Sequence, residues 1–362
     1  MKKKIKLFDP VSGSSEENAL KKTLKSHFWA SGSGVKKVQE FEKKFTKFVG
    51  ANQCVAVNSR TAALHLALSL ENIKNKEVIL PSLSFVSTAH SVIYNNAKPI
   101  FVDVDPVTLC IDPDSIRKSL TKKTRVILPV HFAGMPCNLD EIMNLCEENN
   151  AILIEDAAHA TGATYKNKPI GSHGLAACFS FHPVKNLAMP TGGAITLNGT
   201  LSRKHKDILK IRRWCGISNR KGWEYNVSEL GWNYYMNEFS ATIGIEQLKK
   251  LKKMNKKRKT IAKRYAKEIC VENKMTYNDS CVYHLYWLRI QSRTKFIKKM
   301  NNVGIETGIH FQPIHQMTFY KKRETNLPIT EKIGREIVSI PIHPNLSNSD
   351  VDYIIKKVNE FS

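Results

Sequence analysis

Short apolar runs alternate with helix-like segments through the first part of the chain. The apolar runs cover residues 54–57, 77–80, 99–104, 125–131 and 151–155, and the helix-like segments between them cover 62–70, 87–94, 115–120 and 139–149. Strands that are apolar on both faces are typical of a parallel sheet with helices on both sides. The pattern therefore predicts an α/β fold with a mostly parallel, doubly wound sheet.

The flanking segments predict further helices and one more strand. After a lead-in, apolar residues recur at a helical period through 35–49. We also expect a strand at 283–290 and helices at 201–213, from 231 through the lysine-rich stretch to 268, at 295–302 and at 351–358. Because the pattern changes from about residue 282, we predict a second domain that begins near residue 250, with a large domain over 1–250 and a smaller C-terminal α/β domain over 251–362.

The composition is that of a globular protein with an unusual charge. The 362 residues are 42% hydrophobic and 24% charged, but the formal net charge is +24. The lysines form short clusters without the interleaved aromatic residues or motifs of a nucleic-acid-binding protein. We therefore expect a solvated basic surface and no nucleic-acid partner, although such a surface also attracts phosphorylated ligands.

Cysteine spacing and the lengths of the apolar runs indicate the cellular compartment of the protein. Eight cysteines occur without a CxxC pair or a metal-ligand spacing, so we expect free thiols and no metal site. The first residues carry charge but no apolar signal segment, and no run approaches the roughly 18 apolar residues of a membrane span. These features predict a cytoplasmic protein without membrane insertion.

Candidate chemistry concentrates between residues 151 and 197. An apolar run ends in Asp156, His159 follows shortly after, and Lys185 stands alone after a strand-like segment. A lysine amine can condense with the aldehyde of pyridoxal phosphate, and an aspartate can keep the ring nitrogen protonated. The two side chains can share a pocket only if neighbouring strands bring them to one carboxyl edge of the sheet.

The segment 54–70 reads as a strand, a polar turn and a helix. It places free N–H groups and the hydroxyls of Ser59 and Thr61 at a helix N-terminus, where phosphate binds readily. By spacing alone, capping of the helix by these two side chains is the preferred interpretation.

Several longer strings occur together in one order: NSRTAALHLAL, EVILPSLSFVSTAHSVIYNNAKPIFVDVD, VILPVHFAGMPCNLDEI, IEDAAHATGATY, FSFHPVKN, GWNYYMNEFSATIGIEQL and IHFQPIH. Through them the chain resembles, over nearly its full length, the sugar aminotransferases of the DegT/DnrJ/EryC1/StrS family. The resemblance implies a fold-type-I enzyme that uses pyridoxal phosphate and acts on nucleotide-linked keto-sugars. The subgroup that aminates C4 of UDP- or dTDP-linked sugars looks nearest, through EDAAHA and FSFHPVKN.

The resemblance implies roles around the cofactor. Lys185 matches the lysine that binds the cofactor aldehyde, and Asp156 matches the carboxylate that pairs with the ring nitrogen. His159 matches the position that contacts the phenolic oxygen. Phe85 matches an aromatic residue stacked on the ring, although its position alone favours a core phenylalanine at a helix start.

Further matches concern the phosphate, the partner subunit and the sugar. Thr61, the amide of Arg60 and Ser180 match phosphate-binding positions, and Asn233 matches a segment that reaches the partner's cofactor, which implies a homodimer with shared active sites. The substrate-binding residues expected from the resemblance are Gly32, His310 and His315. By spacing alone, a structural role is preferred for the two histidines.

The resemblance also implies a reaction. Glutamate would give its amino group to the cofactor, with pyridoxamine phosphate as the intermediate form, and the keto-sugar would then take that group. Lys185 would serve as covalent anchor and as general acid and base, which requires an amine that is partly neutral near pH 7.

The chain departs from the family pattern at four places. Arg60 stands where the family usually has glycine, and we expect its side chain either to add a phosphate or nucleotide contact or to point to solvent. The turn 189–191 lacks the usual glutamate, Cys215 replaces a common histidine, and Tyr235 replaces arginine or asparagine. None of these departures is expected to involve Lys185 or Asp156.

Three alternatives stay open on sequence alone. A 3-keto-sugar aminotransferase shares every cofactor residue named above. Family members that remove a C3 hydroxyl carry histidine in place of the lysine, and Lys185 argues against that reaction. A non-catalytic regulator that keeps the fold would not need the complete set of lysine, aspartate and phosphate-binding residues.

Overall fold

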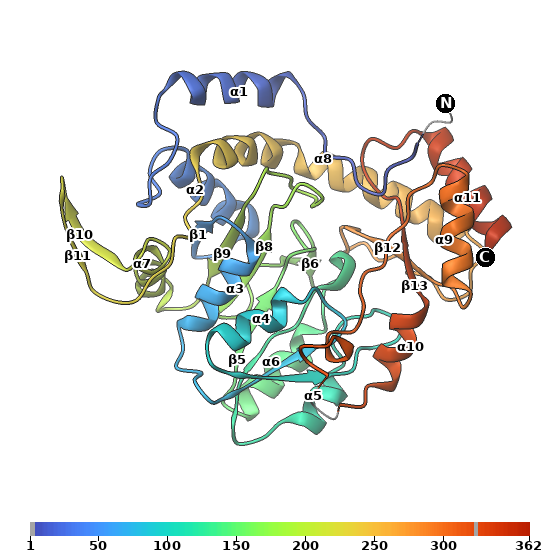
Figure 1. The fold of residues 1–362 in the computed structure, drawn as a ribbon, viewed down its shortest axis with the longest axis horizontal. Coiled ribbons are helices and arrows are strands. Elements are labelled where there is room, and N and C mark those ends of the chain that lie inside the picture. Colours follow the sequence, from blue (N-terminus) through green and yellow to red (C-terminus); the bar gives the residue numbers. More distant parts are fainter. Residues whose placement is uncertain (1–3, 322–324) are drawn as a thin grey trace.

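A seven-stranded sheet forms the centre of the computed structural model, which describes residues 4–321 and 325–362 (Figure 1). The strand order is β1-β9-β8-β5-β4-β2-β3, and β9 alone runs antiparallel to its neighbours. The strands are β1 (Gln53–Val57), β2 (Glu77–Pro81), β3 (Lys98–Val102), β4 (Thr124–Ile127), β5 (Ile152–Asp156), β8 (Ala176–Ser180) and β9 (Gly193–Leu197). The predicted fold class, a mostly parallel doubly wound sheet, is confirmed.

Helices cover both faces of the sheet because alternate strand residues point to opposite sides. Val78 and Leu80 of β2 face one core, whereas Ile79 between them faces the other. The first core is completed by α3 (Arg60–Ser69), α4 (Ser87–Tyr94) and α7 (Ser202–Arg212). The second is completed by α2 (Lys37–Val49), α5 (Pro113–Ser119), α6 (Leu139–Glu148) and α8 (Glu238–Glu268). Apolar residues on both faces of each strand therefore reflect two separate cores.

A second group of elements lies beyond the sheet, on the right of Figure 1. It contains the strand pair β12 (Tyr286–Arg289) and β13 (Ile337–Ile340) with helices α9 (Arg293–Asn302), α10 (Pro328–Glu336) and α11 (Asn348–Phe361). The N-terminal segment joins this group, since Ile5 pairs with Ile305. Residue 250 lies inside the continuous helix α8, and the division of the chain into two domains stays a prediction.

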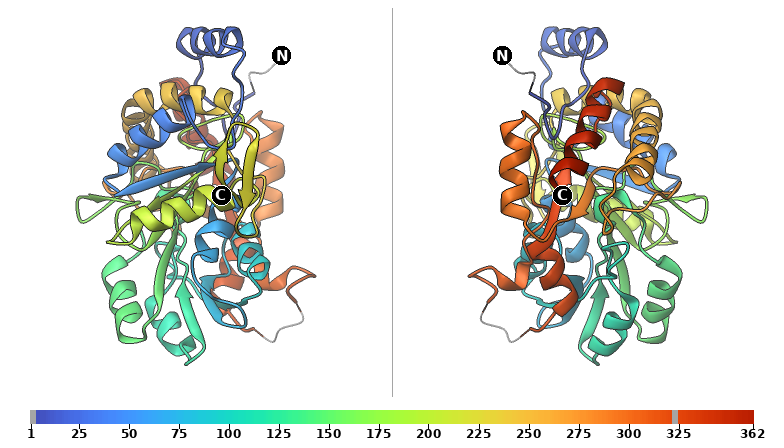
Figure 2. Two further views of the ribbon diagram at one scale, coloured as in Figure 1. Left: turned by 90° about the vertical axis from the view of Figure 1, so that its left-hand side faces the viewer. Right: turned by 90° about the vertical axis from the view of Figure 1, so that its right-hand side faces the viewer.

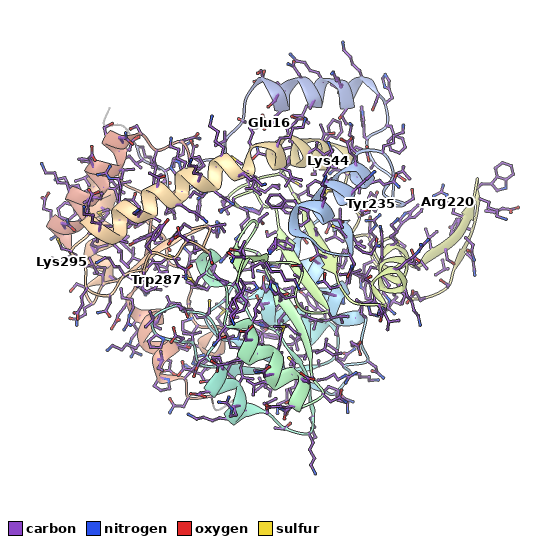
Figure 3. The ribbon with its side chains drawn as sticks, turned by 180° about the vertical axis from the view of Figure 1, so that it is seen from behind. Glu16, Lys44, Arg220, Tyr235, Trp287 and Lys295 are labelled. Atoms are coloured by element: carbon purple, nitrogen blue, oxygen red, sulfur yellow. The ribbon has the colours of Figure 1, made fainter. Side chains whose placement is uncertain are left out.

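A two-stranded hairpin projects from the opposite end of the molecule. It consists of β10 (Ile217–Lys221) and β11 (Glu224–Val227). Figure 1 shows it standing clear of the other elements, and in the left view of Figure 2 it projects toward the viewer. Figure 3 labels Arg220 on the hairpin and Lys295 of α9 at the far side. Trp223 between the two strands is 88% exposed. The molecule therefore presents large apolar side chains at this tip.

Most predicted elements are present with ends shifted by a few residues, but β9, β13, α10 and the hairpin β10–β11 were not predicted, and three further differences occur. The lead-in contains a helix, α1 (Ser14–Lys25), that was not predicted. The segment 231–237 is not helical, because Asn237 caps α8 by accepting a hydrogen bond from the N–H of Ser240 at 2.8 Å. The strand predicted at 283–290 is shorter. No helix of the described residues combines the length and apolarity needed to cross a bilayer.

Candidate active site

A cavity of about 310 Å³ opens at the carboxyl ends of the central strands. Six of the residues predicted for the site or its surroundings line it: Arg60, Thr61, Phe85, Ser180, Lys185 and His310. Residues separated by much of the chain thus meet at one place, as the sheet topology predicts.

Lys185 follows β8 and carries the reactive amine of the cavity. Burial, together with the nearby Arg60 cation, lowers the pKa of the Lys185 amine to about 7 from its ordinary 10.5, against the opposing attraction of Asp156. Its Nζ lies within hydrogen-bond distance, 3.1 Å, of Nε2 of His284, and the tautomer of the ring decides which nitrogen donates. The amine is therefore partly neutral near pH 7, as a nucleophile and general base requires.

Asp156 ends β5 behind the cavity wall. Its Oδ1 accepts a hydrogen bond from the N–H of Ala158 at 3.2 Å, and its Oδ2 accepts one from the Thr88 hydroxyl at 2.9 Å. The Arg60 Nη1 lies 3.0 Å from the same Oδ2. The prediction that no departure from the family pattern involves Asp156 is therefore wrong. The Arg60 side chain does not point to solvent, because the buried carboxylate attracts it.

Histidines surround the lysine in neutral form. The N–H of Ala133 donates to Nδ1 of His159 at 3.2 Å, which leaves the ring proton on Nε2. The rings of His159 and His284 lie 4.4 Å apart. Burial, reinforced by the Lys185 cation, lowers the pKa of both rings well below the ordinary value, and that of His310 to about 4. The cavity therefore gains no positive charge from these rings at neutral pH.

Polar groups gather at the end of the cavity formed by α3 and β8. Ser59 caps α3 by accepting the N–H of Ala62 at 3.1 Å, so capping is confirmed for Ser59. Arg60 and Thr61 are the first residues of α3, whose N–H groups have no carbonyl partner within the helix. With Ser180 at the end of β8, they fit a bound phosphate.

Phe85 lies at the cavity rim and is 50% exposed, so the core position that its place in the sequence favoured is wrong. The Arg60 guanidinium lies 6.0 Å from the centre of its ring. The ring is thus available to a flat ligand.

Five predicted residues do not line the cavity: Asp156 and His159, described above, lie behind its wall, and Gly32, Asn233 and His315 lie elsewhere. Gly32 lies against the Trp214 ring, and the Asn233 carbonyl accepts a hydrogen bond from Asn58 at 3.3 Å. His315 is buried between Ser82 and Glu331, with ring nitrogens at 2.7 and 3.2 Å from their oxygens. The structural reading of His315 therefore agrees with its contacts.

Sequence reasoning missed other residues that line the cavity: Phe8, His284 and Phe311. The Phe8 ring stacks on His284 with centres 5.7 Å apart, although Phe8 belongs to the N-terminal lead-in. Its sequence neighbours give no catalytic signal. His284 carried one, since it is a polar residue within a strand-like apolar run.

A near-neutral lysine facing a helix N-terminus, at the carboxyl edge of a mostly parallel sheet, defines the class of fold-type-I enzymes that use pyridoxal phosphate. Comparison with known proteins narrows the class. The model of the DegT/DnrJ/EryC1/StrS aminotransferase family matches residues 10–359, and the chain belongs to this family. It is a sugar aminotransferase with pyridoxal phosphate as its cofactor.

Individual relatives and solved structures agree with this family assignment. The spore coat polysaccharide biosynthesis protein SpsC of Bacillus subtilis is 35% identical, over 97% of this chain and 95% of its own. Among solved structures, the PMP-form of the putative sugar aminotransferase Spr1654 from Streptococcus pneumoniae has a TM-score of 0.94 at 26% identity, covering 99% of this chain and 98% of its own. Helicobacter pylori PseC, an aminotransferase involved in the biosynthesis of pseudoaminic acid, has a TM-score of 0.92 at 25% identity, covering 99% of each chain.

Proposed function

We propose that this enzyme transfers an amino group from glutamate to C4 of a nucleotide-diphosphate-linked 4-keto-6-deoxy-sugar, for amino-sugar and surface-glycan biosynthesis. The observation that carries the proposal is the Lys185 amine, which faces the cavity with a pKa of about 7. Such an amine can bind a carbonyl carbon and exchange protons at neutral pH.

We assign the cofactor contacts as follows. Lys185 binds the cofactor, Asp156 pairs with its ring nitrogen, His159 contacts its phenolic oxygen, and Phe85 stacks on its ring. Thr61, the Arg60 amide and Ser180 hold its phosphate. The fit rests on the lysine, the polar end of the cavity and the exposed Phe85 ring, all of which line one space.

The bound cofactor supplies an aldehyde that reacts with amines and a ring that withdraws electrons. Lys185 Nζ can then take the proton from Cα of the amino donor and return it during the second half of the reaction. His284 Nε2, at 3.1 Å from Nζ, orients the amine through a hydrogen bond. The apolar rings of Phe8 and Phe311 help to exclude water from this proton transfer.

The sugar-nucleotide part of the proposal rests on relatives and on charge. SpsC is named for polysaccharide biosynthesis and PseC for pseudoaminic acid biosynthesis, so both belong to carbohydrate pathways. A net charge of +24 favours recruitment of a diphosphate-bearing substrate. His310 lines the cavity and is our candidate contact for the sugar, whereas Gly32 and His315 remain predictions from the resemblance.

We further propose a homodimer in which Asn233 approaches the partner's cofactor. The exposed hairpin β10–β11 supports an interface there, because Asn233 pairs with Trp214, three residues before the hairpin begins. All eight cysteines are unpaired, which agrees with a reducing compartment, and we propose the cytoplasm as the location.

The test is glutamate-dependent amination across UDP-, dTDP- and GDP-linked 4-keto-6-deoxy-sugars and a 3-keto-sugar, with product NMR to locate the new amine. We expect turnover with a 4-keto substrate, an absorbance band that glutamate bleaches, and loss of both in Lys185→Ala. Amination only at C3 would establish the 3-keto alternative. A protein that neither binds pyridoxal phosphate nor aminates any sugar would contradict the proposal.

A further inference from the structure

The Arg60 side chain separates the cavity from Asp156. Arg60 lines the cavity, whereas Asp156 does not, and the Asp156 side chain is 0% exposed. Within residues 4–321 and 325–362, the guanidinium pairs through Nη1, with the Asp156 carboxylate at 3.0 Å and the Thr88 hydroxyl at 3.0 Å. The cavity is thus open at Lys185, whereas Arg60 covers Asp156, the residue assigned to the ring nitrogen.

Arg60 occupies the carboxylate that the ring nitrogen would use. Its guanidinium holds Oδ2 of Asp156, whereas the Phe85 ring, 6.0 Å from the guanidinium, is half exposed. The other carboxylate oxygen already accepts the Ala158 N–H. A pyridine ring can reach Asp156 only after the guanidinium moves away.

A displaced guanidinium needs a new anion. Breaking a buried ion pair without replacement is strongly unfavourable, because the charges have lost their hydration. Nε and Nη2 of Arg60 make no hydrogen bond or ion pair with the residues that the structure describes, so they can take another partner. The arginine backbone stands between Ser59 and Thr61 at the start of α3, beside the polar end of the cavity. Rotation of the side chain about its own Cα keeps the guanidinium within reach of a phosphate bound there, which an arginine can grip with two parallel hydrogen bonds.

We propose that Arg60 exchanges partners when the cofactor binds: its guanidinium moves from the Asp156 carboxylate to the cofactor phosphate. The inference rests on the proposed cofactor site and adds a residue to it. The arginine neutralises Asp156 in the cofactor-free chain, uncovers it for the ring nitrogen, and becomes a phosphate ligand in the loaded enzyme. The cofactor phosphate thereby does more than anchor the ring, because it draws away the side chain that blocks the ring's own site.

The exchange predicts a distinctive pattern of affinities for pyridoxal phosphate and for pyridoxal, which lacks the phosphate. Dissociation constants are measured on the cofactor-free full-length protein, for the natural chain, Arg60→Ala, Arg60→Lys and the exposed control Arg203→Ala. We expect Arg60→Ala to bind pyridoxal more tightly than the natural chain, since Asp156 is uncovered. The preference for the phosphorylated compound should fall by about tenfold or more.

The controls separate the possible results. Arg203→Ala should keep both constants, and Arg60→Lys, which retains the charge without the planar fork, should show an intermediate preference. If circular dichroism shows that the alanine variant does not fold, Arg60→Lys provides the test in its place. An unchanged phosphate preference in the Arg60 variants, or weaker pyridoxal binding, overturns the exchange. Borohydride reduction that fails to attach the cofactor to Lys185 in the natural chain would instead overturn the site itself.

Discussion

At the scale of single residues, the cavity combines a lysine whose pKa is lowered with histidines whose rings are neutral at pH 7. The lowered pKa of Lys185 follows from burial and from the Arg60 cation, and Asp156 opposes it only partly. At the surface, by contrast, Lys166 pairs with Asp140, and this hydrogen bond raises the pKa of the Lys166 amine. The same chain therefore contains two lysines whose amines lose their protons in different pH ranges.

This difference predicts a pH dependence. In the cofactor-free protein, the rate of acylation of Lys185 by a small neutral reagent should rise as pH passes through about 7 and level off above it, because only the neutral amine reacts. Lys166 should react slowly until the pH exceeds the ordinary value of 10.5. Mass spectrometry of the two peptides across a pH series measures both rates. A Lys185 profile that keeps rising beside that of Lys166 would refute the assignment.

The residues of the site were predictable to different degrees. Lys185 and Asp156 follow from their positions at strand ends and from the resemblance, and the structure brings them near each other. The Arg60–Asp156 ion pair was not predictable, because the pairing depends on where the arginine side chain turns after a helix start. Phe8 was not predictable either, since it reaches the cavity only through the packing of the N-terminal segment.

At the scale of elements, apolar periodicity located most of the buried helices and strands but missed β9, β13, α10 and, in the N-terminal lead-in, α1. This helix contacts α8 through polar side chains: Glu16 pairs with Lys250 at 2.5 Å, and the hydroxyls of Thr23 and Thr242 lie 2.8 Å apart. Figure 3 shows α1 lying along the outside of the molecule, with Glu16 labelled on it. A helix held by polar contacts has no apolar stripe, so a pattern of hydrophobic positions cannot reveal it.

The start of β9 supports the phosphate end of the cavity through a close approach of backbones. A Cβ on Gly193 would lie 2.5 Å from the Ser59 carbonyl and 2.7 Å from the Arg60 nitrogen. Gly193→Ala should therefore displace the start of α3, weaken pyridoxal phosphate binding about tenfold or more, and cost about 1–3 kcal/mol of stability. Fluorescence titration and urea unfolding measure the two effects.

Gly13→Ala is the matched control, because a Cβ there meets nothing within 4 Å. It should leave the cofactor affinity unchanged. Equal affinities in Gly193→Ala and in the natural chain would show that the contact between β9 and α3 does not shape the phosphate end.

A buried arginine, Arg213, connects α7, α2 and β1. Arg213, just after α7, donates to Glu42 of α2 at 2.6 Å and to the carbonyl of Ala56 in β1 at 2.7 Å, with 0% side-chain exposure. Arg213→Met should lower the free energy of unfolding by about 3–5 kcal/mol, because it leaves the Glu42 carboxylate buried without its cation. Urea unfolding at pH 7 measures the loss.

The surface arginine Arg264, which pairs with Glu268 at 2.7 Å, provides the comparison. Arg264→Met should cost about 0–1 kcal/mol, since solvent screens this pair. Similar losses for both variants would mean that the burial of Arg213 contributes nothing to its effect.

At the scale of the whole molecule, the projecting hairpin is the feature that a monomer explains least. Trp223 and Tyr225 are 88% and 59% exposed on it, and large apolar side chains gathered at one tip mark an interaction surface. We expect light scattering to give twice the chain mass of 41.1 kDa. The double substitution Trp223→Ser with Tyr225→Ser should shift the protein toward monomer.

Val107→Ser, at a 55% exposed apolar residue on another loop, should leave the mass unchanged. A natural chain that runs as a monomer at micromolar concentration would contradict the proposed dimer. A dimer that survives the double substitution would move the interface away from the hairpin.

The 31-residue helix α8 runs without a break from the sheet to the C-terminal elements, over roughly 46 Å (Figure 1). Asn255 in this helix accepts a hydrogen bond at 3.0 Å from Asn186, the neighbour of Lys185, and Arg258 further along donates to the Ile342 carbonyl. One rigid rod therefore ties the lysine loop to the far strands and leaves no hinge at residue 250. In the cofactor-free chain, the uncovering of Asp156 should then follow side-chain rotations in the cavity, which are fast, rather than a slow parting of two halves.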